Sequence, residues 1–125
     1  MCREHHPECP GFRIDRFLQP CLLLFLFKGP SHGYELMEKA KHLFFQNVPL
    51  DPGLLYRTLR RMEEDGLVVS SWVTEASGPA KRVYRITEEG KVALSLWAEH
   101  MEQQLLRFQR FLEEYRKVRE EEHSG

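Results

Sequence analysis

One stretch decides the fold: Asp51-Pro-Gly-Leu-Leu-Tyr-Arg-Thr-Leu-Arg-Arg-Met-Glu-Glu-Asp-Gly66. Asp51 can accept a hydrogen bond from the free backbone N–H groups in the first turn of a helix. Pro52 suits the first helical position, where its missing N–H donor is not needed, and Gly66 suits a left-handed residue that ends the helix. The stretch therefore predicts a helix of about four turns.

The two faces of this helix differ in chemistry. Leu55, Leu59 and Met62 recur at i, i+4 and i+7, so they predict a stripe that faces a core. The opposite side carries Gly53, Arg57, Arg60, Arg61 and Glu64. The basic character ends at the acidic run 63–65, which a polyanion would repel, so only the N-terminal half could enter the major groove of DNA. The alternative is an ordinary amphipathic helix with a solvated polar face.

Length and charge restrict the possible classes of protein. The chain has 125 residues, of which 42% are hydrophobic and 30% charged, enough for one domain with a modest core. Its longest apolar run, residues 21–27, is far shorter than the roughly 20 residues that cross a bilayer, so we expect a soluble cytoplasmic protein without a membrane partner. The net charge is −1, so any binding of DNA must depend on local basic patches.

The N-terminal residues 1–14 are expected to form an irregular arm that contains Cys and His. Its pattern is Cys2-x-x-His5-His6-x-x-Cys9, four groups of the kind that bind zinc or another transition metal. Known zinc modules usually take their ligands from two separated segments, so a solvated tail is the alternative. The three cysteines of the chain do not suggest a disulfide framework.

Two helices are expected before the Asp51 helix. The first spans residues 15–27, is apolar all round in its later part and hence buried, and begins at either Asp15 or Pro20. Ser31 is expected to cap a second helix that reaches about Phe45. Its apolar stripe contains Tyr34, Leu36, Met37, Ala40, Leu43 and Phe44. A turn over 46–50 completes a helix-turn-helix arrangement.

A β-hairpin follows the Asp51 helix. Residues 67–75 and 81–87 have strand composition and flank a turn at 76–80, so they predict a two-stranded wing. Lys81 and Arg82 lie next to the turn, where they could reach a phosphate backbone or a minor groove. The alternative is a solvated hairpin tip. Trp72 is expected to pack on the hairpin.

A long helix is expected to end the chain. Thr87, followed by two glutamates, suits its N-cap, and the helix reaches about Glu120, a length of roughly 45 Å. Apolar residues recur in a heptad pattern, which predicts a seam that a second copy of the chain covers. The expected dimer interface contains Leu94, Trp97, Ala98, Met101, Leu105, Phe108, Phe111, Leu112 and Tyr115.

Four motifs together resemble the PadR-like winged-helix transcriptional regulators. They are Pro30-Ser-His-Gly-Tyr-Glu-Leu36, the stretch 52–63, Gly66-Leu67, and Lys81-Arg-Val-Tyr-Arg-Ile-Thr-Glu-Glu-Gly90. The resemblance covers about residues 18–115 and is strongest to the subgroup with a single C-terminal helix. It implies an α+β, mostly α, fold: a winged helix-turn-helix domain at 15–90, a dimerisation helix at 91–120, and a tail at 121–125.

The resemblance also implies a homodimeric DNA-binding regulator, usually a repressor that releases double-stranded DNA when a small, often aromatic, compound binds. Its DNA-binding residues would be Ser31, Tyr34, Pro52, Gly53, Leu54, Tyr56, Arg57, Arg60, Arg61, Lys81 and Arg82. In some members a Trp of the last helix stacks on a flat ligand. Trp97 occupies a comparable stretch, and packing in the core is the alternative for it.

The sequence contains no pattern typical of an enzyme. It has no glycine-rich phosphate loop and no Ser or Cys nucleophile at a strained strand-to-helix turn. The second hypothesis is therefore a homodimeric metal- or drug-binding protein that has the winged fold but does not bind DNA.

Overall fold

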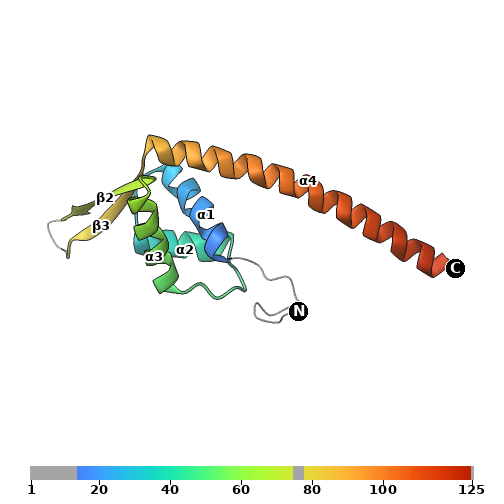
Figure 1. Ribbon diagram of the computed structural model, residues 1–125. Coiled ribbons are helices and arrows are strands. Elements are labelled where there is room, and N and C mark those ends of the chain that lie inside the picture. The colour runs from blue at the N-terminus through green and yellow to red at the C-terminus, as the bar shows by residue number, and fades with distance from the viewer. Residues whose placement is uncertain (1–13, 75–77, 125) are drawn as a thin grey trace. The chain divides into compact units, whose positions relative to one another are not determined.

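The computed structural model describes residues 14–74 and 78–124 (Figure 1). The element order is α1 (Ile14–Lys28), β1 (Ser31–His32), α2 (Gly33–Leu43), α3 (Pro52–Glu64), β2 (Val68–Val73), β3 (Lys81–Ile86) and α4 (Glu88–Ser124). The chain forms two compact units that divide between Leu94 and Ser95. The first unit has the arrangement of a winged helix-turn-helix domain, and the second is the remainder of α4.

Helix α3 confirms the local prediction for the Asp51 stretch. The Asp51 carboxylate accepts a hydrogen bond from the Gly53 N–H at 3.1 Å, and Pro52 is the first helical residue. Gly66 has a φ of +78°, the left-handed conformation that favours glycine after a helix. The predicted core stripe is fully buried in the structure: Leu55, Leu59 and Met62.

Helix α1 runs without interruption from Ile14 to Lys28, so the earlier of the two possible starts is correct and Pro20 lies inside the helix. It packs against α2, α3 and β3. The prediction that its later part is buried all round is wrong, because Leu24 and Phe27 are 38% and 56% exposed. An apolar composition therefore did not suffice for burial, and the Phe27 ring instead has a cation near it, the Lys91 ammonium of α4 at 5.8 Å from its centroid.

Helix α2 begins two residues later than predicted. His32 is its N-cap, with Nδ1 accepting a hydrogen bond from the Glu35 N–H at 3.4 Å. Ser31 was the wrong choice of cap because it belongs to β1, where it pairs with Tyr84 of β3. The helix ends at Leu43, and only part of the predicted apolar stripe is buried: Leu36, Met37 and Ala40. The stripe was too broad, since Tyr34, Leu43 and Phe44 are exposed.

The sheet has three antiparallel strands in the order β1-β3-β2. The predicted hairpin of β2 and β3 is confirmed, with pairs from Val68↔Ile86 to Val73↔Lys81, and Figure 1 shows it as a ribbon that extends beyond the helices of its unit. The sequence did not predict β1, which pairs along the other side of β3. Directly paired residues share a face of a sheet. One face therefore carries Ser31, Ser70, Trp72, Arg82 and Tyr84.

Thr87 connects the end of α3 to the start of α4. Its hydroxyl accepts a hydrogen bond from the Gly90 N–H at 3.0 Å, which confirms the predicted N-cap, and donates to the Gly66 carbonyl at 2.7 Å. Gly90 lies so close to the turn that an added Cβ would overlap the Leu67 carbonyl oxygen. Gly90 thus permits close packing between the turn after α3 and the first turn of α4.

From Ser95 onward, α4 carries large apolar side chains that the structure leaves exposed. Leu105, Phe108 and Phe111 are 56%, 62% and 67% exposed, and the rings of Phe111 and Tyr115 stack at 6.5 Å with an interplanar angle of 6°. The helix continues to Ser124, four residues beyond its predicted end at Glu120. Within the described ranges, no helix is long and apolar enough to span a membrane.

Candidate functional site

The exposed face of α3 is basic from its second turn onward. Arg57, Arg60 and Arg61 are exposed, and the first turn of the helix has no acidic residue. Tyr56 is 46% exposed on the same helix. The remaining residues predicted to contact DNA from α3 are Pro52, which is exposed, and Gly53 and Leu54, which are half-buried.

The acidic end of α3 binds the wing. The Arg82 guanidinium of β3 donates to the Glu63 carboxylate at 3.0 Å through one terminal nitrogen, and its Nε donates to the Ser70 hydroxyl at 2.9 Å. Ser70 in turn donates to the other oxygen of Glu63 at 2.7 Å. Arg82 also lies 5.8 Å from the centroid of the Tyr84 ring. This closed triangle fixes β2 and β3 against α3, so Arg82 is held by protein groups rather than free at the wing tip.

Lys81 differs from Arg82 in its surroundings. It is exposed, and among residues 14–74 and 78–124 it forms no ion pair. Its charge reaches the start of α2, where it helps to lower the pKa of Glu35. Of these two cations, Lys81 is therefore the one that remains available to an external anion.

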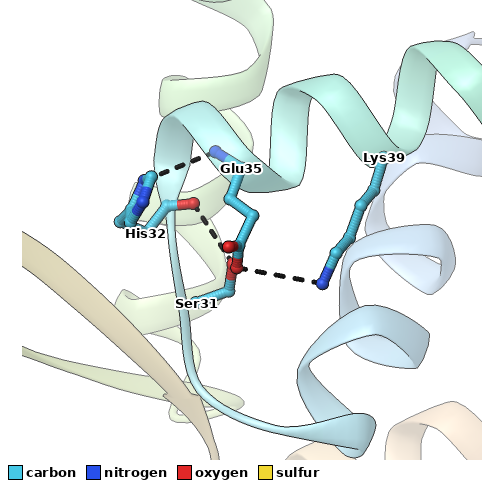
Figure 2. Close-up of polar contacts among 4 residues, drawn as sticks. All are labelled: Ser31, His32, Glu35 and Lys39. Atoms are coloured by element: carbon cyan, nitrogen blue, oxygen red, sulfur yellow. Dashed lines mark hydrogen bonds and ion pairs between the residues drawn. The ribbon is translucent and has the colours of Figure 1, made fainter.

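A polar cluster holds the start of α2 in place (Figure 2). The Ser31 hydroxyl donates to the Glu35 carboxylate, and the Lys39 ammonium lies 3.8 Å from the same carboxylate oxygen. The bond from Ser31 is the main reason that the pKa of Glu35 lies below its ordinary value of 4.5, and Lys39 and His32 add to it. Ser31 is only 4% exposed and its hydroxyl is used internally, so its side chain is unavailable at the surface. Tyr34, by contrast, is 68% exposed.

An open groove of about 480 Å³ lies between the start of α2, α3 and the sheet. It combines four aromatic rings with the two wing cations, and is lined by His32, Gly33, Tyr34, Tyr56, Trp72, Lys81, Arg82 and Tyr84. A Cβ on Gly33 would come within 2.5 Å of the Tyr56 ring, so only glycine lets that ring lie against the first turn of α2. Trp72 is 67% exposed in this groove, which contradicts the expectation that it packs on the hairpin.

Tyr84 forms part of the groove and is buried. Burial raises the pKa of its hydroxyl above the ordinary value of 10.0, while the charge of Arg82 acts in the opposite direction. Arg60 also lowers it, and Glu63 and Tyr56 raise it. Cations from α3 and from the wing therefore act on the same position. The sequence predicted four of the groove residues, and the cross-strand pair Trp72↔Arg82 is the signal that would have added Trp72.

The other two predicted sites lie elsewhere in the chain. Cys2, His5, His6 and Cys9 are outside the described residues. Over the described ranges, no group of three or more His, Cys, Asp or Glu is placed to hold a metal ion. Trp97 is half-buried, and its ring meets that of His100, in the same helix, edge-on at 6.4 Å.

The family model described as the transcriptional regulator PadR-like family matches residues 22–96, more than half of the chain. The chain belongs to the PadR-like family of transcriptional regulators. Family membership confirms the resemblance stated from the four motifs, and it identifies the chain as a regulator rather than an enzyme. The matched range extends from the buried part of α1 to the first part of α4, and it contains the groove and the basic face of α3.

Curated relatives of this PadR-like regulator are also transcriptional regulators. It is 31% identical over 100 residues to the transcriptional regulator YqjI of Escherichia coli, and the alignment covers 76% of this chain and 44% of the relative. It is 50% identical over 46 residues to the transcriptional regulator Rv3488 of Mycobacterium tuberculosis, covering 37% of this chain and 42% of the relative. The chain thus spans less than half the length of these curated relatives.

Solved structures share the fold of the PadR-like regulator. A conserved protein, TM0937, described as a potential transcriptional factor, is 30% identical with a TM-score of 0.73, covering 88% of this chain and 97% of its own. Bacillus subtilis PadR, solved in complex with operator DNA, is 24% identical with a TM-score of 0.60, covering 66% of this chain and 47% of its own. The latter similarity establishes the winged fold alone.

Proposed function

We propose that the chain is a homodimeric DNA-binding repressor that releases double-stranded DNA when a small aromatic compound binds. The observation that carries the DNA part is the exposed face of α3 with its basic residues Arg57 and Arg60, beside a wing that presents Lys81. Helix-turn-helix proteins place the N-terminal residues of the second helix against base edges in the major groove. The complex of Bacillus subtilis PadR with operator DNA, which has the same fold, supports this assignment.

The distribution of charge on α3 supports contact through the part of the helix that precedes its acidic residues 63–65. Glu63 is neutralised by Arg82, and the Asp65 carboxylate lies 3.5 Å from Arg61 Nε. Arg57 and Arg60 form no ion pair among the described residues, so they are the helix cations available to DNA. We assign base contacts to Arg57 and backbone phosphate contacts to Lys81, because the latter extends from the wing.

The DNA assignment is tested by measuring affinity over a range of salt concentrations. Lys81→Ala should weaken binding to every sequence alike and reduce the slope of log K against log salt by about one unit, since one phosphate contact is lost. Arg57→Ala should mainly relax sequence preference at one position of the site. Lys41→Ala removes an exposed lysine at the far end of α2 and serves as the control. Identical behaviour of the three variants would contradict the assignment and favour a winged-helix dimer that binds a metal or drug but not DNA.

The dimer part of the proposal depends on the apolar side chains of α4. Large apolar side chains at the heptad seam and its flank are exposed in a single chain, which a solvated helix does not require: Leu105, Phe108, Phe111, Leu112, Tyr115 and Val118. Leu106 is exposed as well but lies off this spacing. The heptad spacing of the other six suits a second copy of the same helix, since an interface between identical chains is self-complementary. The remaining predicted interface residues are half-buried, except Ala98, which is exposed: Leu94, Trp97, Ala98 and Met101.

A charged double substitution tests the dimer. Leu105→Asp with Phe108→Asp would bury two unpaired carboxylates per chain in the seam, at a cost of several kcal/mol, and should give a monomer in sedimentation equilibrium. Gln103→Asp adds a carboxylate off the seam and should leave the dimer intact. A double variant that sediments as a folded dimer would place the interface elsewhere.

The proposed site for the small-molecule effector is Trp97 of α4. Trp97 offers a half-buried aromatic face, and a dimer formed through α4 would supply two of them, a suitable slot for a flat ligand. Titration with a flat aromatic cation should quench Trp fluorescence and lower DNA affinity, and Trp97→Ala should abolish both effects. The second proposed signal, zinc bound by the N-terminal arm, predicts a response that Cys2→Ser with Cys9→Ser removes.

A further inference from the structure

The groove beside the wing contains several aromatic rings next to cations. Neither the proposed contact of α3 with DNA nor the proposed pairing of α4 accounts for these rings. The groove combines exposed aromatic faces with cations in a concave site, whereas a surface that only tracks phosphates requires no aromatic rings. Trp72 and Tyr34 are 67% and 68% exposed, so most of each ring lacks a packing partner in the protein. A volume of about 480 Å³ is in the range of small-molecule sites in proteins.

We propose that this groove binds a nucleotide, with its base stacked on the aromatic rings and its phosphate held by Lys81. Bases stack on tryptophan and tyrosine side chains whatever their sequence, because every base has a π-face. Trp72 of β2, Tyr34 of α2 and Tyr56 of α3 supply rings to the groove from three different elements. The base therefore accounts for the aromatic lining.

The electrostatics of the groove select an anion. Lys81 lies on the rim without an ion-pair partner among the described residues, and α2 begins at Gly33, so the positive end of its helix dipole lies in the groove. Two carboxylates lie near, but Glu35 is held by Ser31 and Lys39 and Glu63 by Arg82. A phosphate is therefore favoured over a neutral or cationic aromatic ligand.

The position of Tyr56 indicates a built site rather than an accidental hollow. Its ring lies against Gly33, and an added Cβ at that position would come within 2.5–2.9 Å of three Tyr56 atoms. The glycine thus sets the depth of the groove, which any side chain at this position would reduce. The hydrogen bonds of Arg82 to Glu63 and Ser70 hold a second lining residue in place.

Trp72 provides a direct assay. The chain has two tryptophans, so Trp97→Phe leaves Trp72 as the only tryptophan reporter of the groove. In this variant we expect adenosine monophosphate to quench fluorescence at a concentration at least about tenfold lower than adenosine does. Inorganic phosphate has no ring to stack, so its affinity is measured by competition and should be at least about tenfold weaker than that of adenosine monophosphate. Lys81→Ala should weaken binding of adenosine monophosphate about tenfold and leave adenosine unchanged, whereas Tyr34→Ala should weaken both.

Lys41→Ala is the matched control, because it removes an exposed lysine of α2 that does not line the groove. Equal affinities for adenosine monophosphate, adenosine and phosphate, or equal effects of Lys81→Ala and Lys41→Ala, would overturn the proposal. A parallel titration with tetrathymidylate distinguishes an unpaired nucleic-acid strand from a free nucleotide as the natural ligand. Tighter binding of the oligonucleotide indicates an unpaired nucleic-acid strand, and equal binding indicates a free nucleotide.

One consequence rests on the proposed function. The groove contains Tyr34, Tyr56 and Lys81, which are also assigned to DNA contact, so a bound nucleotide should compete with duplex DNA. The fluorescence titration contains no DNA and therefore tests the groove alone. Quenching without competition would retain the nucleotide site and place the duplex elsewhere, whereas competition without quenching of Trp72 would overturn the site.

Discussion

Replacing Glu63 by Gln should lower the stability of the domain and at the same time raise its affinity for DNA. Glu63 accepts hydrogen bonds from Arg82 and Ser70, so the uncharged amide loses the ion pair that holds the wing against α3. The same change releases Arg82, whose guanidinium is then able to bind a phosphate. The two effects have opposite signs because a single cation serves both partners.

The geometry sets the size of the effect. Unit charges 3.0 Å apart, the distance between Arg82 and Glu63, attract by about 1.4 kcal/mol at a dielectric constant near 80. The two side chains are 46% and 31% exposed, so the aqueous limit is the relevant one, and ordering two long side chains reduces the net value. We expect a coupling free energy of about 0.5–1 kcal/mol. The gain in DNA affinity from releasing Arg82 is then at most about fivefold.

Two measurements test this expectation. A double-mutant cycle of Glu63→Gln and Arg82→Ala, followed by urea denaturation, gives the coupling free energy directly. DNA affinity at low and high salt is then compared between Glu63→Gln and Glu64→Gln. Glu64 is exposed at the neighbouring position, so its substitution removes the same charge from α3 without breaking the bond to Arg82. The excess effect of Glu63→Gln over this control measures the release of Arg82.

Either of two results would contradict the proposed role of the ion pair between Glu63 and Arg82. Equal gains in affinity for the two glutamine variants would mean that only the general removal of negative charge matters. A coupling free energy of zero would mean that the triangle of Glu63, Ser70 and Arg82 does not hold the wing in solution.

The other predictions concern packing and ionisation. Gly90→Ala should lower the free energy of unfolding by about 1–3 kcal/mol in urea denaturation, since its Cβ overlaps the Leu67 carbonyl, whereas Gly78→Ala, with nothing within 4 Å, should be nearly neutral. Burial raises the pKa of Cys21 to about 12, so mass spectrometry should detect its alkylation at pH 8 only after unfolding. The pKa of Glu35 is lowered by folding, so its contribution to stability is present above pH 4.5 and lost as the pH falls through the folded value. Glu35→Gln should flatten that loss in acid denaturation.

The elements that the sequence predicted correctly are set by interactions between residues close together in the chain. Asp51, Pro52 and Gly66 each act within one turn of α3, and Thr87 caps α4 through a contact three residues away. Such signals are complete in the sequence, because the interacting groups are neighbours in the chain. The heptad spacing of α4 is of the same kind.

The errors arose where a distant partner decides the outcome. Ser31 has a side chain suited to capping, but its backbone pairs with Tyr84 of β3, and this places His32 at the cap instead. Arg82 was expected to be free at a hairpin tip, yet its partner Glu63 lies nineteen positions earlier in the chain. Pairings of this kind depend on the sheet register, which residue composition does not specify.

The acidic end of α3 explains how a chain with a net charge of −1 can present a basic surface. An exposed acidic run beside basic residues would weaken the attraction of α3 for DNA. In the structure two of these acids are matched internally, Glu63 by Arg82 of the wing and Asp65 by Arg61 of the same helix. Local pairing, rather than total charge, therefore determines the field along the middle of α3, where Arg57 and Arg60 remain exposed. The same pairing fixes the wing, so the charge pattern and the shape of the surface have one physical cause.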